Sequence, residues 1–182
     1  MVDINKLPKI ITIDEYGGDF HSYIDAIFNV FDCDFNKHKT KFGSHILRLK
    51  YHPEFQDRAY TFYHMTHKGE KEDERVPDLR RCERMSWARP TIEKTQEYNL
   101  RFWEQKRKGK SRVCIWLDVD NGDNYFVILD VRKTFVLLWT AFYAEKPHHV
   151  KKKQNEYNAW LASVKGVLKT PDELIKDIQD RI

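Results

Sequence analysis

Hydrophobic residues recur at helical spacing near the start of the chain. From Asp19 onward they fall every three or four positions, at Phe20, Tyr23, Ile24, Ile27, Phe28 and Phe31. This spacing gives one wide apolar stripe, which is typical of an amphipathic helix. The Asp19 carboxylate stands where the helix start carries partial positive charge. The pattern therefore predicts a helix over 19–31 with its stripe in the core.

The second half of the chain has the pattern of β-strands separated by turns. Apolar runs occur at 100–103, 112–117, 125–129 and 135–142, with glycine-containing turns at 107–110 and 121–124 between the first three. Such a series predicts a meander of four antiparallel strands. An earlier strand is predicted at 44–51, where His52-Pro53 ends it.

Helical patterns return after the last predicted strand. The segment 151–165 has helical character, and Thr170, Pro171 and Glu173 have the form of a capping box at the start of a last helix. The expected fold is α+β, with an N-terminal helix or helices packed on a four-stranded or larger antiparallel meander sheet and with C-terminal helices. We expect one domain over 1–182, in which an N-terminal region (1–58), a central core (60–146) and C-terminal helices (148–182) follow one another.

Composition fits a globular chain. Hydrophobic residues make up 41% of the 182 residues and aromatic residues 14%, enough for one core that buries roughly 70% of the unfolded surface. The sequence contains no apolar run of about 20 residues, the length needed to cross a bilayer, and no signal-peptide pattern at its start. Three widely spaced cysteines fit reduced thiols. A cytoplasmic protein without membrane attachment is expected.

The stretch 61–92 collects side chains that suit phosphodiester chemistry. His64 and His67 stand before a glycine turn, and Arg80, Arg81, Arg84 and Arg89 follow an acidic segment. Histidine transfers protons near neutral pH, while arginine binds phosphate with paired donors. The competing interpretation is a solvated surface on which these arginines pair with nearby acids.

Local structure decides which of these side chains meet. A strand over 59–67 would place His64 and His67 on opposite faces, whereas a helix would place them on one face. A short helix over 79–87, capped by Asp78, would put Arg80, Arg84 and Trp87 on a common face. Trp87 is then a candidate for stacking on a base, with burial in the core as the alternative.

Positive charge is concentrated in the middle of the chain. Residues 61–112 hold fourteen lysines and arginines against nine acids, whereas the two flanking thirds are nearly balanced. The densest part lies at the predicted hairpin tip, in Lys106, Arg107, Lys108, Lys110 and Arg112. An anionic partner is expected there; a solvated turn is the alternative.

Three pieces of the sequence carry a resemblance to a known family. They are YHMTH at 63–67, PDLRRCERMSWARP at 77–90, and LLWTAFY at 137–143 followed by a basic helical tail. Together with helices that precede an antiparallel meander, they resemble the barnase–EndoU–colicin–RelE superfamily of metal-independent nucleases, in its phage-associated branch. The resemblance covers roughly 60–157.

The resemblance implies a metal-independent endoribonuclease of toxin or phage-related type. In this reaction a ribose 2′-hydroxyl attacks the adjacent phosphate and leaves a cyclic phosphate. His64 would transfer a proton, and Arg80 and Arg84 would stabilise the phosphate. Thr140 and Tyr143 look like the family's polar residues at the end of the last strand; the alternatives are that Thr140 only satisfies a backbone group and that Tyr143 is an aromatic residue packed beside the sheet.

Substrate binding would involve further residues, namely Arg81, Arg89, Trp87, Lys106, Arg107, Lys108 and Lys110. The expected partners are RNA and an antitoxin or inhibitor protein, and no metal or cofactor is expected. Substitution of His64 or Arg84 by alanine is expected to abolish cleavage without unfolding the chain.

Two other functions stay open. A noncatalytic module could use the same basic strip to bind nucleic acid or an acidic partner protein. A zinc enzyme using His64, His67, His148 or His149 is disfavoured because the sequence has neither an HExxH motif nor a cysteine pair at ligand spacing.

Overall fold

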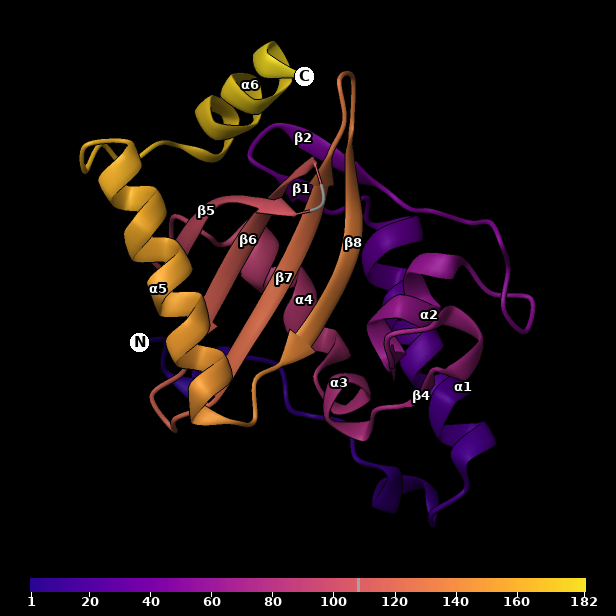
Figure 1. Ribbon diagram of the computed structural model, residues 1–182. Coiled ribbons are helices and arrows are strands. Elements are labelled where there is room, and N and C mark those ends of the chain that lie inside the picture. Colours follow the sequence, from indigo (N-terminus) through magenta and orange to yellow (C-terminus); the bar gives the residue numbers. More distant parts are fainter. Residues whose placement is uncertain (108) are drawn as a thin grey trace.

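A mixed β-sheet forms the centre of the computed structural model, which describes residues 1–107 and 109–182. Over these residues the sheet has six strands in the order β1-β2-β8-β7-β6-β5 (Figure 1). Their bounds are β1 Lys41–Phe42, β2 His45–Arg48, β5 Arg101–Arg107, β6 Lys110–Asp118, β7 Asn124–Val131 and β8 Val136–Tyr143. Two short strands, β3 His67–Lys68 and β4 Val76–Pro77, pair with each other apart from this sheet.

The class α+β is confirmed, but the sheet is not the predicted antiparallel one. Strands β5 to β8 pair antiparallel in chain order, whereas β2 lies parallel to β8. Between β2 and β8 the chain passes through three α-helices and five strands, and β8 then runs beside β2 in the same direction. Because this pairing joins residues about ninety positions apart, such as Leu47 and Val136, no turn pattern in the sequence announces it.

The helices precede and follow the strands of the meander. They are α1 Phe20–Phe31, α2 Tyr60–Thr66, α3 Leu79–Glu83, α4 Ala88–Glu93, α5 Pro147–Ser163 and α6 Pro171–Arg181. Short helical turns add η1 Ile4–Lys6, η2 Ile13–Tyr16, η3 Asp32–Lys37, η4 Glu72–Glu74 and η5 Met85–Trp87. Of the two alternatives for 59–67, the helix is present over 60–66, whereas His67 has an extended backbone and begins β3.

Helix α1 forms as its pattern predicts. The Asp19 side chain accepts a hydrogen bond from the Ser22 backbone N–H at 2.9 Å, which caps the first turn. The buried residues of the helix are Tyr23, Ile24, Ile27 and Phe31, all from the apolar stripe. The predicted capping box of α6 is also present, with the Thr170 N–H and the Glu173 carboxylate 2.7 Å apart.

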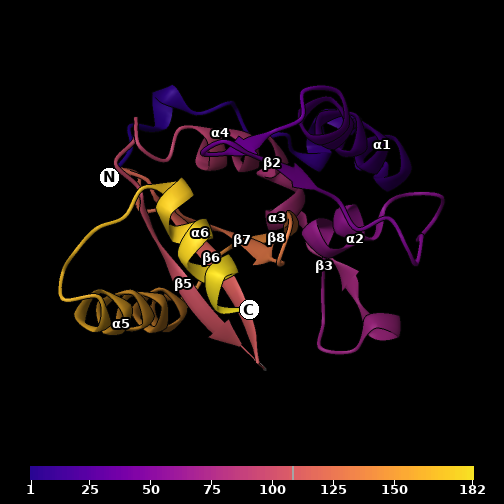
Figure 2. The same ribbon diagram turned by 90° about the horizontal axis from the view of Figure 1, so that it is seen from above.

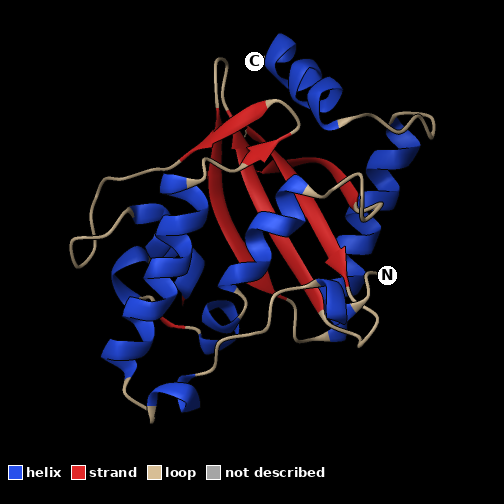
Figure 3. Ribbon diagram, turned by 180° about the vertical axis from the view of Figure 1, so that it is seen from behind, coloured by secondary structure: helices blue, strands red, loops and turns tan. Residues whose placement is uncertain are grey.

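Different helices cover the two faces of the sheet. On the front face α5 crosses over β5 and β6 (Figure 1), and Tyr157 of α5 contacts Trp103 with ring centroids 5.7 Å apart. On the back face α4 lies over the strands (Figure 3), where Trp87 of η5 contacts Tyr125. Helix α2 packs beside β8. The front of β7 and β8 therefore lies between helix α5 on one side and helix α2 on the other.

Candidate nucleic-acid interface

One row of side chains crosses five strands on the front face of the sheet. The register pairs Gln105 with Arg112, Arg112 with Asp130, Asp130 with Leu137, and Leu137 with Arg48. Paired residues project from the same face of a sheet. This is the face that carries α5, because Trp103, two positions before Gln105 on β5, contacts that helix.

Further cations extend this row toward the end of the sheet. Arg107 and Lys110 pair with each other. Arg107 is two positions after Gln105 and Lys110 is two positions before Arg112, so strand alternation places both on the front face. Arg132 donates to the Asp130 carboxylate at 2.6 Å. We call the following five residues the basic face: Arg48, Arg107, Lys110, Arg112 and Arg132.

Positive charge on the basic face exceeds the negative charge that it meets. Asp130 is buried, with Arg132 at 2.6 Å on one carboxylate oxygen and Arg112 at 4.0 Å from the other. Arg107, Lys110 and Arg48 are exposed, and over the described residues none of them forms an ion pair with a carboxylate. One carboxylate therefore stands against five cations, and the surface attracts anions.

Aromatic rings lie among these cations. The Arg112 guanidinium lies 4.7 Å from the Trp139 ring centroid, and that of Arg48 lies 4.7 Å from the Phe135 ring centroid. Both rings are partly exposed. The Trp139 ring is in turn 5.2 Å from the His64 ring. A continuous strip thus runs from the basic face across Trp139 to helix α2.

His64 is held by a carboxylate at the end of this strip. Its Nε2 lies 2.9 Å from the Glu72 carboxylate, which also lies 3.6 Å from the Arg75 guanidinium. The Tyr63 hydroxyl donates to the Glu72 carbonyl oxygen. These contacts fasten the acidic segment 70–75 onto α2.

Burial controls the protonation of His64. The side chain is almost fully enclosed, and burial, together with the nearby Arg75 charge, lowers its pKa from 6.5 to about 4 although Glu72 acts in the opposite direction. At neutral pH the imidazole is therefore uncharged, so Nε2–H donates to Glu72 and Nδ1 keeps its lone pair.

Thr140 and Arg81 reach the same helix, but they bind its backbone. The Thr140 hydroxyl donates to the His64 carbonyl oxygen at 2.9 Å, and Arg81 Nη1 donates to the carbonyl oxygens of His64 and His67 at 3.1 and 3.2 Å. The structure therefore brings these predicted residues together. Their polar atoms join α2 to α3 and β8, which is a structural role.

Arg84 and Tyr143 form a second cluster, centred on Asp123. Both bind Asp123: Arg84 Nη2 donates to one carboxylate oxygen at 3.1 Å and the Tyr143 hydroxyl to the other at 3.0 Å. Arg84 also pairs with Glu83 at 3.0 Å and is only 4% exposed. Because it is buried and pairs with two carboxylates, this guanidinium has a structural role.

The predicted common face of Arg80, Arg84 and Trp87 is wrong. Helix α3 ends at Glu83, and the Arg84 backbone (φ −105°, ψ 19°) leaves the helical conformation. Arg80 is exposed as a result, while Arg84 and Trp87 turn inward. Trp87 is 1% exposed, and its indole N–H donates to the Pro8 carbonyl. It therefore has no free ring face for a base.

The remaining predicted residues divide between two regions. Arg89 pairs with Glu93 and Asp34 away from the front of the sheet, as the salt-bridged alternative described. Lys106, Arg107 and Lys110 are exposed near the tip of the β5–β6 hairpin; Lys108 lies outside the described residues. The sequence indicated Arg112 only as the end of the dense basic run at the hairpin, and it gave no signal for Arg48, Arg132, Trp139 or Glu72 as site residues.

Comparison with protein families, with curated proteins and with solved structures finds no match to the chain. The resemblance to metal-independent nucleases accordingly stays a prediction. No helix in the described part of the chain has the length and apolar character needed to cross a membrane.

The Arg84 cluster predicts a loss of stability on substitution. Arg84→Ala leaves Asp123 and Glu83 without their cation, so we expect the free energy of unfolding to fall by roughly 3–5 kcal/mol. Arg80→Ala, at an exposed position of the same segment, is expected to change it by less than about 0.5 kcal/mol. Urea denaturation of both variants measures the difference; equal stability of the two would contradict the structural role of Arg84.

The low pKa of His64 predicts a pH dependence of stability. Its folded-state pKa of about 4 lies below the ordinary value of 6.5, so the unfolded chain takes up the proton first as the pH falls. Stability from this group is complete above pH 6.5 and decreases toward pH 4, by up to about 3 kcal/mol. In His64→Gln this part of the decrease should vanish.

Denaturation at a series of pH values between 4 and 7 tests this. His148→Gln, at an exposed position of α5, serves as the matched control and should keep the slope of the wild type. If His64→Gln keeps that slope as well, His64 is not the buried neutral group described above.

Proposed function

We propose that the chain binds single-stranded RNA across the basic face, with Trp139 as a stacking surface. The observation that carries this proposal is the in-register row in which Arg112 and Arg48 flank Leu137 and Asp130 on one face of the sheet. Cations on the face of a sheet can contact the phosphates of an RNA strand that crosses it. Their contribution to affinity does not depend on base sequence.

The aromatic residues favour a single strand over a duplex. A base can stack on an aromatic ring only when it is unpaired and turned outward, and such stacking contributes about 1–3 kcal/mol per base. Trp139 and Phe135 are partly exposed beside Arg112 and Arg48. From Arg112 to Arg48 the row spans three strand spacings, about 14 Å, which suits an extended segment of a few nucleotides.

Salt dependence measures the phosphate contacts. Each cation that neutralises a phosphate of a single strand contributes about 0.7 to the slope of log affinity against log salt. Lys110→Gln should therefore weaken binding of a fluorescent oligouridine and reduce the slope by about 0.7. Fluorescence anisotropy between 50 and 300 mM salt provides the measurement. Over this range the Debye length falls to roughly half.

Lys9→Gln is the matched control, because Lys9 is exposed but lies near Ser86 of η5. It should leave the slope of the wild type unchanged. Equal slopes for Lys110→Gln and the wild type would remove the basic face from the binding site, and preference for duplex DNA would contradict the single-stranded substrate.

A second candidate function is metal-independent cleavage of the bound RNA at His64. The observation that favours it is the Glu72 carboxylate at 2.9 Å from Nε2, beside Trp139. This contact fixes the tautomer in which neutral Nδ1 can accept a proton. In such a reaction Nδ1 takes the proton of a ribose 2′-hydroxyl, the 2′-oxygen bonds to phosphorus, the bond to the 5′-oxygen breaks, and water protonates the departing 5′-oxygen. A toxin role with an antitoxin partner rests on the family resemblance alone.

Incubation with oligouridine in excess EDTA separates binding from cleavage. Cleavage predicts 2′,3′-cyclic phosphate ends with the wild type, and at least a hundredfold slower reaction with His64→Gln, since general base catalysis contributes about 10²–10⁴. Lys110→Gln should cleave normally at saturating RNA in low salt. Intact RNA that still shows salt-sensitive binding would reject cleavage and retain the binding function.

A further inference from the structure

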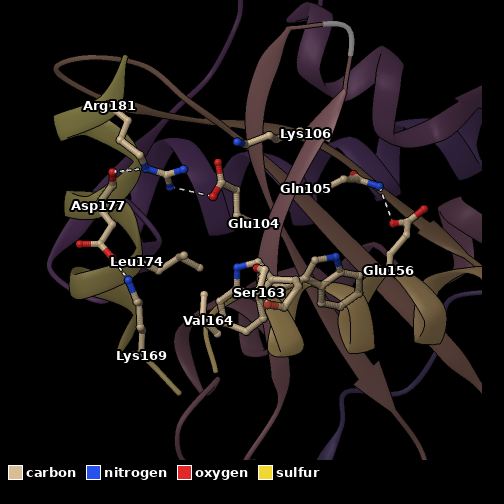
Figure 4. Close-up of a pocket in the computed structure, with 12 residues that line it drawn as sticks. Glu104, Gln105, Lys106, Glu156, Ser163, Val164, Lys169, Leu174, Asp177 and Arg181 are labelled. Atoms are coloured by element: carbon tan, nitrogen blue, oxygen red, sulfur yellow. Dashed lines mark hydrogen bonds and ion pairs between the residues drawn. The ribbon is translucent and has the colours of Figure 1, made fainter. Parts of the chain in front are cut away.

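A cavity of about 620 Å³ lies between α5, α6 and β5, at the β5 edge of the sheet. Figure 4 shows side chains from all three elements turned toward it. Its apolar lining is Trp103, Trp160, Val164 and Leu174, and its polar lining is Glu104, Gln105, Lys106, Glu156, Ser163, Lys169, Asp177 and Arg181. This volume is in the range of sites that hold a ligand.

The cavity opens along an unpaired strand edge. Four consecutive residues of β5, from Trp103 to Lys106, line it, and β5 is the last strand of the sheet, bonded only to β6. Within the described residues, no backbone group of β5 bonds to any element other than β6. Because alternate residues of an antiparallel strand turn N–H and C=O away from the partner, the edge offers a row of free backbone groups.

Side chains on both sides of this edge form walls for an added strand. Toward α5, Gln105 donates to Glu156 at 2.7 Å and Trp103 contacts Tyr157. Toward α6, Glu104 accepts from Arg181 at 2.7 Å. Alternate side chains of a bound strand would therefore meet α5 and α6 in turn.

The charges in the cavity leave one cation uncompensated. Arg181 pairs with Glu104 and Lys169 with Asp177, while Glu156 accepts from Lys153 and Gln105. Lys106 forms no ion pair over the part of the chain that the structure describes. In addition, the buried Trp103 indole N–H has no acceptor there. Within the described residues, the Lys106 ammonium and the Trp103 indole N–H therefore each lack a partner in the cavity.

We propose that this cavity binds an extended acidic peptide of a partner protein as a further strand beside β5. Backbone bonds to the β5 edge supply affinity, and a carboxylate beside Lys106 supplies specificity. A second copy of this chain fits less well, since β5 passes between α5 and α6 (Figure 2) and a second sheet would bring its own flanking helices against them. The proposal does not depend on RNA binding, because none of the five residues of the basic face lines the cavity.

A positional-scanning library of acetylated, amidated hexapeptides tests the proposal on the full chain. We expect one position to select Asp or Glu, and the selection to change to Lys or Arg with Lys106→Glu. The best peptide is then made with N-methyl groups on alternate amides. One alternate set should lose roughly tenfold affinity for each methyl group, since each removes one hydrogen bond; the other set should bind normally.

Ser163→Phe and Ala162→Phe form the matched pair of protein variants. Both positions are exposed on α5, but only Ser163 lines the cavity, so only Ser163→Phe should abolish peptide binding. The proposal is overturned if no hexapeptide binds, if both methylated sets bind alike, or if sedimentation shows that Ser163→Phe disrupts a dimer of this chain instead.

Discussion

The register that aligns Gln105, Arg112, Asp130, Leu137 and Arg48 across five strands is the constraint on which the front surface depends. Side chains alternate between the faces of a strand, so a slip of one residue would exchange the two faces. In this register the neighbouring positions Leu47, Val113, Leu129 and Val136 are buried on the back face. Burial of these apolar side chains therefore fixes where the cations lie, although the cations themselves contribute little to the core.

Burial also separates structural arginines from arginines that are free to bind. Arg84 faces two carboxylates and Arg81 two backbone carbonyls, and moving either toward a phosphate would leave buried acceptors unpaired. On the basic face the balance is reversed, because one carboxylate, Asp130, meets Arg112 and Arg132 together. Excess charge, rather than the number of arginines, distinguishes the surface for which we propose RNA binding.

Features set by neighbouring residues could be predicted from the sequence. Asp19 caps α1, the strands of the β5–β6 hairpin follow their apolar runs, and Thr170 starts α6 with a capping box. Each depends on side chains a few positions apart, for which spacing is informative. Helical spacing failed at Arg84 because the chain leaves the helix there and buries the guanidinium against Asp123, which is 39 positions away.

The site itself depends on pairings that spacing does not encode. Arg48 joins the row only through the parallel contact of β2 with β8, and Trp139 reaches Arg112 only through the register of three strands. His64 was selected for its chemistry, yet its partner Glu72 comes from a segment that reads as a solvated acidic linker. The sequence showed the basic hairpin as a run of charged residues. It did not show that the charge continues across the sheet to Arg132 and Arg48.

Photo-crosslinking with a 4-thiouridine oligonucleotide, followed by mass spectrometry of the crosslinked peptides, tests the central claim most directly. Binding across the basic face predicts crosslinks in peptides that contain Trp139 and Arg112, and their loss at high salt. Crosslinks confined to α1, to the Arg89 region or to the exposed end of α5 would place RNA elsewhere and contradict the account.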